Sequence, residues 1–175
     1  MFDARFRDQR LQTLLAQVER EDFQQAETLF ADVLCREPDY VDALVGQGFL
    51  CANRGEYAEA LAICDQARKI DDLCPQVYLL RGLIQAMDDD SAGAAEEYRK
   101  ALLLDMNFIM PHYYLSTIFA RQGRLRDARR ELRNTLRLLE NLPDEALVPY
   151  SGGLTREVFL HLCRDDLAAV PAESE

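Results

Sequence analysis

Three residues near the C-terminus, Ser151, His161 and Cys163, are of types that can do nucleophilic or acid–base chemistry. They lie in the stretch VPYSGGLTREVFLHLCRDDL (148–167), where a glycine-rich turn leads into a predicted helix. Such a turn can bind an anion, because free backbone N–H groups and the helix dipole point toward it. His161 and Cys163 are two residues apart and face different directions, which disfavours a Cys–His dyad. The stretch is therefore either an anion-binding turn or a structural end-piece.

No other motif in the sequence supports catalysis or cofactor binding. Gly46-Gln47-Gly48 lacks the preceding strand and the third glycine of a dinucleotide-binding loop, and the aspartates at 88–90 do not have calcium-loop spacing. Neither histidine has an acid or cysteine at ligand spacing, and we expect His112 to pack in the core. The five cysteines, an odd number without a C-x-x-C pair, argue against a disulfide framework and a structural zinc site. We expect no enzyme activity from this chain by itself, no cofactor and no metal.

The charge balance excludes several classes of partner. The chain has 20 Lys and Arg against 31 Asp and Glu, a net charge of −11. This charge repels phosphate backbones and anionic lipids, so we expect neither nucleic acid nor a membrane surface as partner. The charged N-terminus MFDARFRDQR does not resemble a signal peptide, and the longest uncharged run (106–120) is too short to span a membrane. These features predict a cytoplasmic protein.

An internal repeat indicates which elements position these residues. Alanines recur every 34 residues, at 26, 60, 94 and 128. A turn-type position precedes each alanine by five residues, and a mostly bulky position follows it by four: Glu21, Gly55, Asp89 and Gly123, then Phe30, Cys64, Tyr98 and Leu132. The pattern predicts a helix, a tight turn and a second helix, repeated four times. The run of three aspartates at 88–90 predicts a distorted turn in the third repeat.

The 34-residue spacing resembles the tetratricopeptide repeat (TPR) family. The resemblance implies an all-α, right-handed solenoid of four helix-turn-helix repeats (7–40, 41–74, 75–108 and 109–142, together 1–142) with a C-terminal capping helix. Residues 143–175 are expected to form a turn, the capping helix at 155–167 and a frayed tail. Thr155 is the expected N-cap. The helix has an apolar stripe that would pack on the fourth repeat: Val158, Phe159, Leu162 and Cys163.

The TPR resemblance also implies a binding surface, because ligands of this family contact the first helix of each repeat. Carried onto this sequence, the family's contact positions give a largely apolar groove: Val45, Phe49, Asn53, Leu79, Leu83, Met87, Met110, Tyr113 and Thr117. The Lys and Asn with which some TPR proteins grip a chaperone's carboxylate are absent. A long apolar patch is usually covered. The cover is either a partner protein or peptide segment, or this chain's own C-terminal helix.

A second candidate surface is an arginine-rich helix predicted at 125–139. Its arginines fall on one broad face, with the apolar residues opposite: Arg126, Arg129, Arg130, Arg133 and Arg137. This face is either a solvated outer surface or a docking face for an acidic partner. RNA binding is disfavoured, because interleaved exposed aromatic residues are missing.

The tail carries a second resemblance, to the C-terminal region of CheR-type chemoreceptor methyltransferases that carry TPR repeats. The match is a pattern of six residues before a short apolar helix: Val148, Pro149, Ser151, Gly153, Leu154 and Thr155. The family's S-adenosylmethionine-dependent protein-glutamate methyltransferase domain has no counterpart in this sequence. The resemblance therefore implies an accessory domain that docks chemoreceptors or other signalling proteins in bacterial chemosensory signalling. The alternative is a small acidic secretion-type TPR chaperone, which would need an open groove and is not expected to have this tail.

Overall fold

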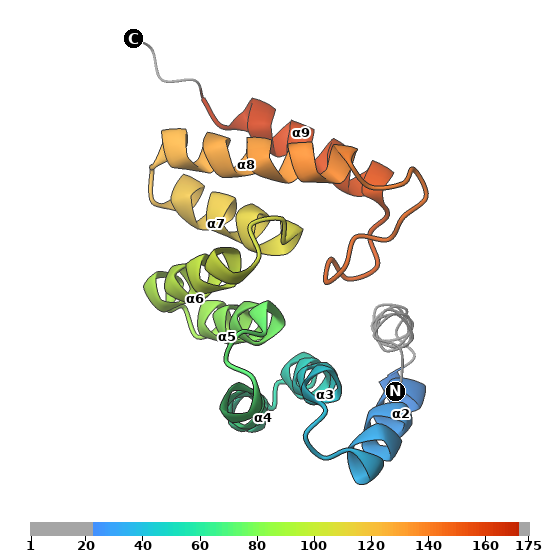
Figure 1. Cartoon of the computed structure of the whole chain (residues 1–175). Helices are drawn as coiled ribbons and strands as arrows, with labels where there is room; N and C mark the ends of the chain where they lie inside the picture. The colour runs from blue at the N-terminus through green and yellow to red at the C-terminus, as the bar shows by residue number, and fades with distance from the viewer. Residues whose placement is uncertain (1–22, 172–175) are drawn as a thin grey trace.

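A computed structural model describes residues 23–171 and shows an all-α fold, as predicted. The helices of this part are α2 (Phe23–Arg36), α3 (Val41–Asn53), α4 (Tyr57–Ile70), α5 (Pro75–Met87), α6 (Ser91–Leu104), α7 (Ile109–Arg121), α8 (Leu125–Glu140) and α9 (Arg156–Ala169). They form a curved solenoid with α3, α5 and α7 on its inner side and α4 and α6 on its outer side (Figure 1). The expected first helix of the repeat at 7–40 lies outside the described residues. Between residues 23 and 171, no helix is long and apolar enough to cross a membrane.

The helices keep the 34-residue period of the sequence. The inner helices α3, α5 and α7 begin at 41, 75 and 109, and the outer helices α4, α6 and α8 begin at 57, 91 and 125. The recurrent alanines are all fully buried: Ala26, Ala60, Ala94 and Ala128. The positions four residues later are buried as well: Phe30, Cys64, Tyr98 and Leu132. Small and large side chains thus alternate along the outer helices, and neighbouring helices pack closely against both.

Glycine allows the closest approach between two helices. A Cβ atom on Gly82 of α5 would lie 2.5 Å from Cε1 of Tyr98 on α6. No side chain fits at that distance, so the Tyr98 ring packs directly on the α5 backbone.

The three described turns inside the repeats share one backbone geometry. Gly55, Asp89 and Gly123 all have positive φ, of 79°, 59° and 73°. Each following N–H donates to a carbonyl oxygen five residues before it, at 2.8–2.9 Å, as in a Schellman cap. The expectation of a distorted turn in the third repeat is therefore wrong. Aspartate is among the few residues other than glycine that tolerate this conformation, and Asp90 caps α6 by accepting a hydrogen bond from the N–H of Gly93.

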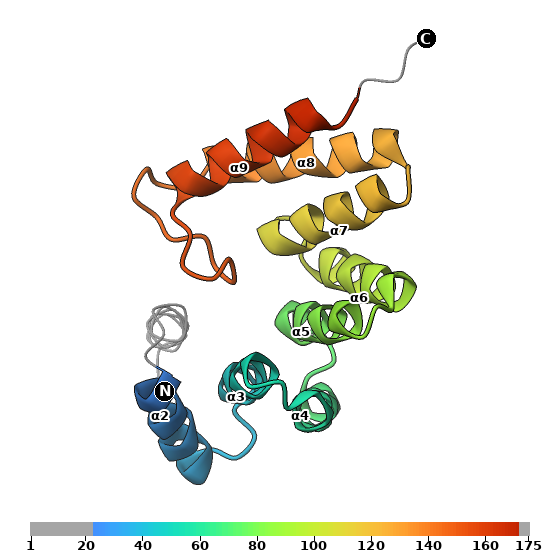
Figure 2. The ribbon, with the colours of Figure 1, turned by 180° about the vertical axis from the view of Figure 1, so that it is seen from behind.

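Helix α9 lies along α8 at the C-terminal end of the solenoid (Figures 1 and 2). Thr155 is its N-cap, as predicted, and accepts a hydrogen bond from the N–H of Val158. The expected apolar stripe is wrong by one residue. Phe159 and Cys163 are buried, and Leu160 is buried beside them. Val158 (52 % exposed) and Leu162 face outward instead. The stripe keeps its helical spacing, but the helix is rotated.

Polar contacts fix the rotation of α9. Nε of Arg156 donates to the carbonyl oxygen of Leu139 at the start of the helix (2.9 Å). At its end, the Arg129 guanidinium donates to the carbonyl oxygens of Leu167 (3.1 Å) and Val170. A cation at this end also interacts favourably with the helix dipole. These contacts could not be foreseen from the apolar pattern of α9 alone.

Candidate protein-binding surface

The concave side of the solenoid is lined by α3, α5 and α7, which carry the groove residues predicted above (Figure 1). Three of those residues, Val45, Leu79 and Met110, are buried in the core. Their side chains hold the helices together and are not available to a partner in this structure. The other predicted residues are exposed or half-buried: Phe49, Asn53, Leu83, Met87, Tyr113 and Thr117.

The C-terminal part of α5 offers the most accessible apolar side chain among the predicted groove residues. Met87 is 69 % exposed, and Leu83, one turn earlier, is half-buried. Methionine is flexible and polarisable, so it adapts to partners of different shape. In contrast, the Thr117 hydroxyl on α7 is already used, because it donates to the carbonyl oxygen of Tyr114 at 2.8 Å.

The loop between α8 and α9 reaches into the concave side. It descends from α8 toward the inner helices in both views (Figures 1 and 2). The centroid of the Tyr150 ring in this loop lies 5.2 Å from the ring centroid of Phe49 on α3 and 5.5 Å from that of Phe108, the residue before α7. These are ordinary distances for aromatic pairs. The chain itself therefore covers part of the predicted groove, with a loop residue that the sequence analysis did not single out.

Helix α9 covers another predicted groove residue, Tyr113. The Phe159 ring meets the Tyr113 ring edge-on at 4.9 Å, and the Tyr113 hydroxyl donates to Asp166 at 3.2 Å. Burial, and then the nearby Asp166 carboxylate, raise the pKa of Tyr113. The phenol is thus a neutral hydrogen-bond donor that ties α7 to α9.

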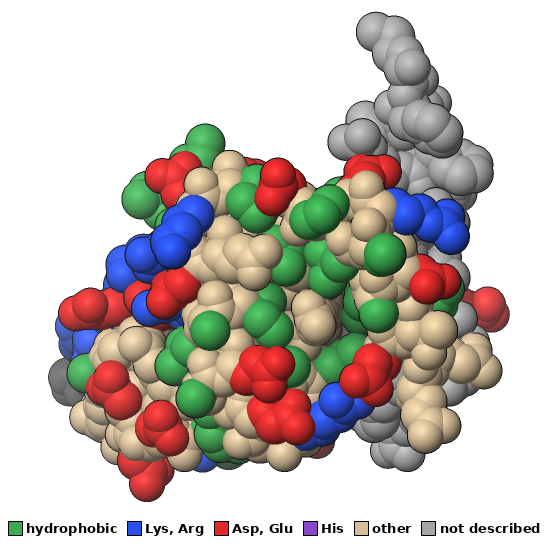
Figure 3. Space-filling view, turned by 90° about the horizontal axis from the view of Figure 1, so that it is seen from below, with side chains coloured by type: hydrophobic (Ala, Val, Ile, Leu, Met, Phe, Trp, Pro, Cys, Tyr) green, Lys and Arg blue, Asp and Glu red, His purple; other side chains and the backbone are tan. Residues whose placement is uncertain are grey.

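The arginine-rich helix α8 does not present its five arginines as one free face. Arg129 is turned toward α9, as described above, and Arg130 pairs with Asp127 (2.9 Å) and Glu131 (3.0 Å). Arg126, Arg133 and Arg137 are exposed on the outer side of the helix. Figure 3, which views the molecule from below, shows hydrophobic side chains in the middle of this face, with both acidic and basic side chains around them.

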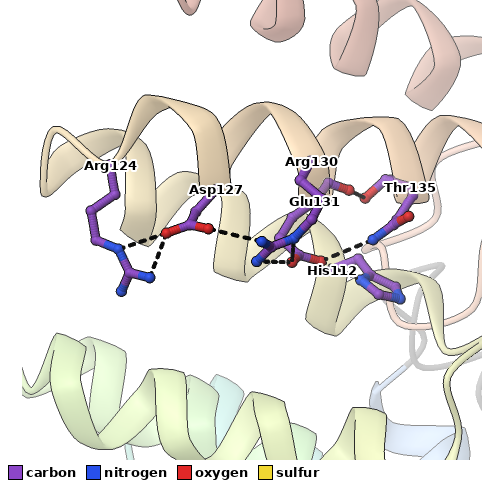
Figure 4. A network of polar contacts seen from close by, with 7 residues as sticks. His112, Arg124, Asp127, Arg130, Glu131 and Thr135 are labelled. Carbon is purple, nitrogen blue, oxygen red and sulfur yellow. Dashed lines mark hydrogen bonds and ion pairs between the residues drawn. The ribbon is translucent and has the colours of Figure 1, made fainter.

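A buried polar network joins α7 to α8 (Figure 4). Nδ1 of His112 lies 2.7 Å from Oε2 of Glu131, and Nε2 lies 3.2 Å from the carbonyl oxygen of Met106. The ionised Glu131 carboxylate only accepts hydrogen bonds, so Nδ1 of His112 donates to it. Burial raises the pKa of Glu131, but hydrogen bonds from His112, Asn134 and Arg130 outweigh it and leave this pKa below its ordinary value.

The predicted core position of His112 is confirmed, but its partner was missed. No acid lies at ligand spacing from His112 along the chain. Glu131 lies 19 residues later on the next helix, between two buried positions, Ala128 and Leu132. In the sequence, an acidic residue between core positions on the apolar side of this helix was the available sign that Glu131 has a buried polar partner.

The tail residues whose side chains could take part in chemistry have structural roles. Ser151 Oγ accepts a hydrogen bond from the N–H of Leu154 (3.0 Å), and Gly152 and Gly153 have positive φ, as expected for a chain reversal. His161 is exposed, and burial raises the pKa of the Cys163 thiol to about 12, which keeps it protonated at neutral pH. A protonated thiol is a weak nucleophile.

Within residues 23–171, one group of side chains places three potential metal ligands together. Cys51, Glu56 and Glu59 have ligand atoms within 4.8 Å of one another at the turn between α3 and α4. Burial, and then the charges of Glu59 and Glu56, raise the pKa of the Cys51 thiol. A neutral thiol beside two exposed carboxylates does not amount to a metal site. All five cysteines are free, and Cys51 and Cys64 are buried.

Solved structures with the same fold come from several protein classes. The type III secretion translocator chaperone SycD of Yersinia enterocolitica is 16% identical, with 76% of this chain and 84% of that chain covered and a TM-score of 0.63. PcrH of Pseudomonas aeruginosa is 19% identical, with coverages of 77% and 93% and a TM-score of 0.63. The Naa15/Naa10 complex bound to HypK-THB is 14% identical, with coverages of 91% and 23% and a TM-score of 0.64. At these identities, the likeness shows the fold alone.

Family models identify the repeats directly. Two models described as tetratricopeptide repeat match residues 17–84 and 109–134. No curated protein matches the sequence. The repeat spacing, the helix pairs and these two matches agree: the chain carries tetratricopeptide repeats, and the part that the structure describes is an all-α solenoid.

Proposed function

We propose that the chain is a protein-docking module that holds a segment of a partner protein on its concave face. TPR folds are built for such contacts, because stacked helix pairs create an extended concave surface. We place the module in the cytoplasm, as the accessory domain of a CheR-type methyltransferase in bacterial chemosensory signalling. The chain itself would supply docking, and an S-adenosylmethionine-dependent domain would supply methyl transfer. In this proposal, residues 1–142 are the repeats and 143–175 the tail that closes them.

The observation that carries the proposal is the way the tail is built. The six residues of the CheR-like pattern form the loop and the N-cap of α9, with Val148 fully buried and Thr155 capping the helix. Val148 therefore seats the tail on the core of the repeats, while Ser151 and Thr155 hold the loop and the start of α9 in shape. This supports a tail that belongs with the array as one unit, as the resemblance implies.

A secretion-type chaperone is the second candidate. It is supported by the likeness to SycD and PcrH over most of their length, and by a solved complex of PcrH with the chaperone binding region of PopD. A chaperone of this kind would need an open groove. Here Tyr150 lies on Phe49 and α9 covers Tyr113, so the groove is partly closed by the chain itself. We therefore rank this candidate second.

Binding measurements with two classes of partner separate the candidates. The purified chain would be titrated by calorimetry with cytoplasmic signalling fragments of chemoreceptors from the same organism, and separately with hydrophobic segments of secreted translocators. Binding of a receptor fragment is expected. Binding of translocator segments alone would replace the first candidate by the second, and binding of neither would contradict both. A methyltransferase-coding segment in the same gene would support the first candidate independently.

A further inference from the structure

The tip of the loop between α8 and α9 (residues 149–153, here called the tip) sits on a fixed neck. The N–H of Val148 donates to the carbonyl oxygen of Leu154 (2.9 Å), and that of Arg156 to Ala146 (2.8 Å). Leu147 and Thr155 form an antiparallel bridge between these bonds. The neck is thus a short hairpin, anchored by the buried side chain of Val148. It holds the tip in place through hydrogen bonds within the loop.

The tip places one aromatic ring against two others from distant parts of the solenoid. Tyr150 lies on Phe49 at 5.2 Å with the planes tilted by 33°, and meets Phe108 at 5.5 Å and 70°. Phe49 is half-buried and Phe108 is buried. The two phenylalanines come from the second and the third expected repeats, and together they form an aromatic surface on the concave side (here called the aromatic site).

The backbone of Tyr150 has a positive φ because Tyr150 is the second central residue of a tight turn, which the N–H of Ser151 closes by donating to the carbonyl oxygen of Val148 (3.2 Å). Its φ is +65°, in the left-handed region that residues with a bulky side chain rarely adopt. Lifting the ring from the aromatic site needs only a rotation of the Tyr150 side chain, so the turn and the neck keep their hydrogen bonds.

We propose that the aromatic site is an acceptor for an aromatic side chain of the partner, and that Tyr150 fills it while no partner is bound. The partner is a protein segment that carries Tyr or Phe in a turn or extended stretch, since that is what the tip presents. It binds by displacing Tyr150, while the neck and α9 stay in place. This inference rests on the proposed function, because it specifies the partner of the same concave face.

The chain's own tip supplies the probe for a test. A fluorescein-labelled peptide ALVPYSGGLTR (residues 146–156) would be titrated by anisotropy against the full-length wild-type chain and against Tyr150→Ala. A tethered side chain competes at an effective concentration on the order of millimolar, so the peptide should bind Tyr150→Ala at least about tenfold more tightly than wild type. The same peptide with alanine in place of tyrosine, and the double variant Phe49→Ala/Tyr150→Ala, should show no binding.

Equal binding to wild type and Tyr150→Ala, or no binding to Tyr150→Ala with its helical circular dichroism intact, would overturn the inference. If Tyr150→Ala does not fold, Tyr150→Trp decides the matter, because the chain contains no tryptophan. Its emission should be blue-shifted and should move to the red when the peptide is added, and an emission that the peptide does not change would also overturn the inference.

Failure here is distinguishable from failure of the proposed function. Receptor fragments that bind the chain while the tip peptide does not would leave the docking module standing and remove only the aromatic site.

Discussion

Replacing Phe159 by alanine tests whether α9 is held by its apolar face. The Phe159 side chain is buried against the core of the fourth repeat, and its ring meets Tyr113 edge-on at 4.9 Å. Removing a buried phenylalanine side chain costs about 3–5 kcal/mol, of which an aromatic pair contributes about 0.5–1.5 kcal/mol. For a chain of this size, each kcal/mol lowers Tm by about 2–4 °C, so a fall of about 6–20 °C is expected if α9 unfolds with the repeats.

A solenoid can also lose its terminal helix alone, because each repeat contacts only its neighbours. Cys163 reports this local opening, since its thiol is fully buried on α9 and burial raises its pKa to about 12. The rate of Cys163 modification by a thiol reagent would be measured near neutral pH. An opening easier by about 3–5 kcal/mol raises that rate on the order of 100- to 1,000-fold or more. The exposed Cys35 would first be replaced by serine.

Val158→Ala is the matched control, because Val158 is the preceding residue on the same helix and is 52 % exposed. It should change stability by no more than about 0.5 kcal/mol. If Phe159→Ala changes neither Tm nor Cys163 modification more than Val158→Ala does, α9 does not cap the repeats through this face.

Further predictions concern the core, the buried network and the thiols. Gly82→Ala should cost about 1–3 kcal/mol in a urea titration, because its Cβ would lie 2.5 Å from Tyr98, and Gly82→Ala/Tyr98→Leu should recover part of the loss; no recovery would contradict the contact. His112→Ala should cost about 1–3 kcal/mol by leaving the buried Glu131 carboxylate without this hydrogen-bond donor, whereas His161→Ala, at an exposed site, should be nearly neutral; equal losses would refute the network. Burial raises the pKa of the Cys64 and Cys163 thiols to about 12. Thiols of the unfolded chain ionise at a pH of about 8.5, so above that pH the unfolded chain releases protons that the folded chain keeps. The free energy of unfolding should therefore fall between about pH 8.5 and 11, and a level or rising value in urea titrations at these pH values would be inconsistent with buried neutral thiols.

The repeat geometry followed from sequence because it depends on contacts close in the chain. Ala60 and Cys64 recur in step with their counterparts, and their burial needs only the helical period and a neighbouring helix. The turn at Asp89 shows the limit of composition: three charged residues suggested distortion, but the conformation depends on whether one residue tolerates positive φ.

The candidate site was predicted less completely, because it depends on contacts between distant segments. Nothing in the repeat pattern connects Tyr150 with Phe49, and only the path of the loop brings them together. The family's contact positions placed Val45 and Leu79 in the groove, although both are buried here. A position in a repeat indicates which helix face a residue lies on, but the curvature and the tail decide whether a partner can reach it.

The central claim is that the concave face binds the partner, and an exposed residue tests it without disturbing the fold. Met87 on α5 is 69 % exposed, and Met106 in the turn between α6 and α7 is 73 % exposed, so Met106→Arg is a matched control for Met87→Arg. The measurement is the calorimetric affinity of both variants for a receptor fragment that binds the wild-type chain. We expect Met87→Arg to weaken binding at least about tenfold, the equivalent of about 1.4 kcal/mol, and Met106→Arg to bind as the wild type does. Unchanged affinity of Met87→Arg, or an equal loss in both variants, would contradict the claim.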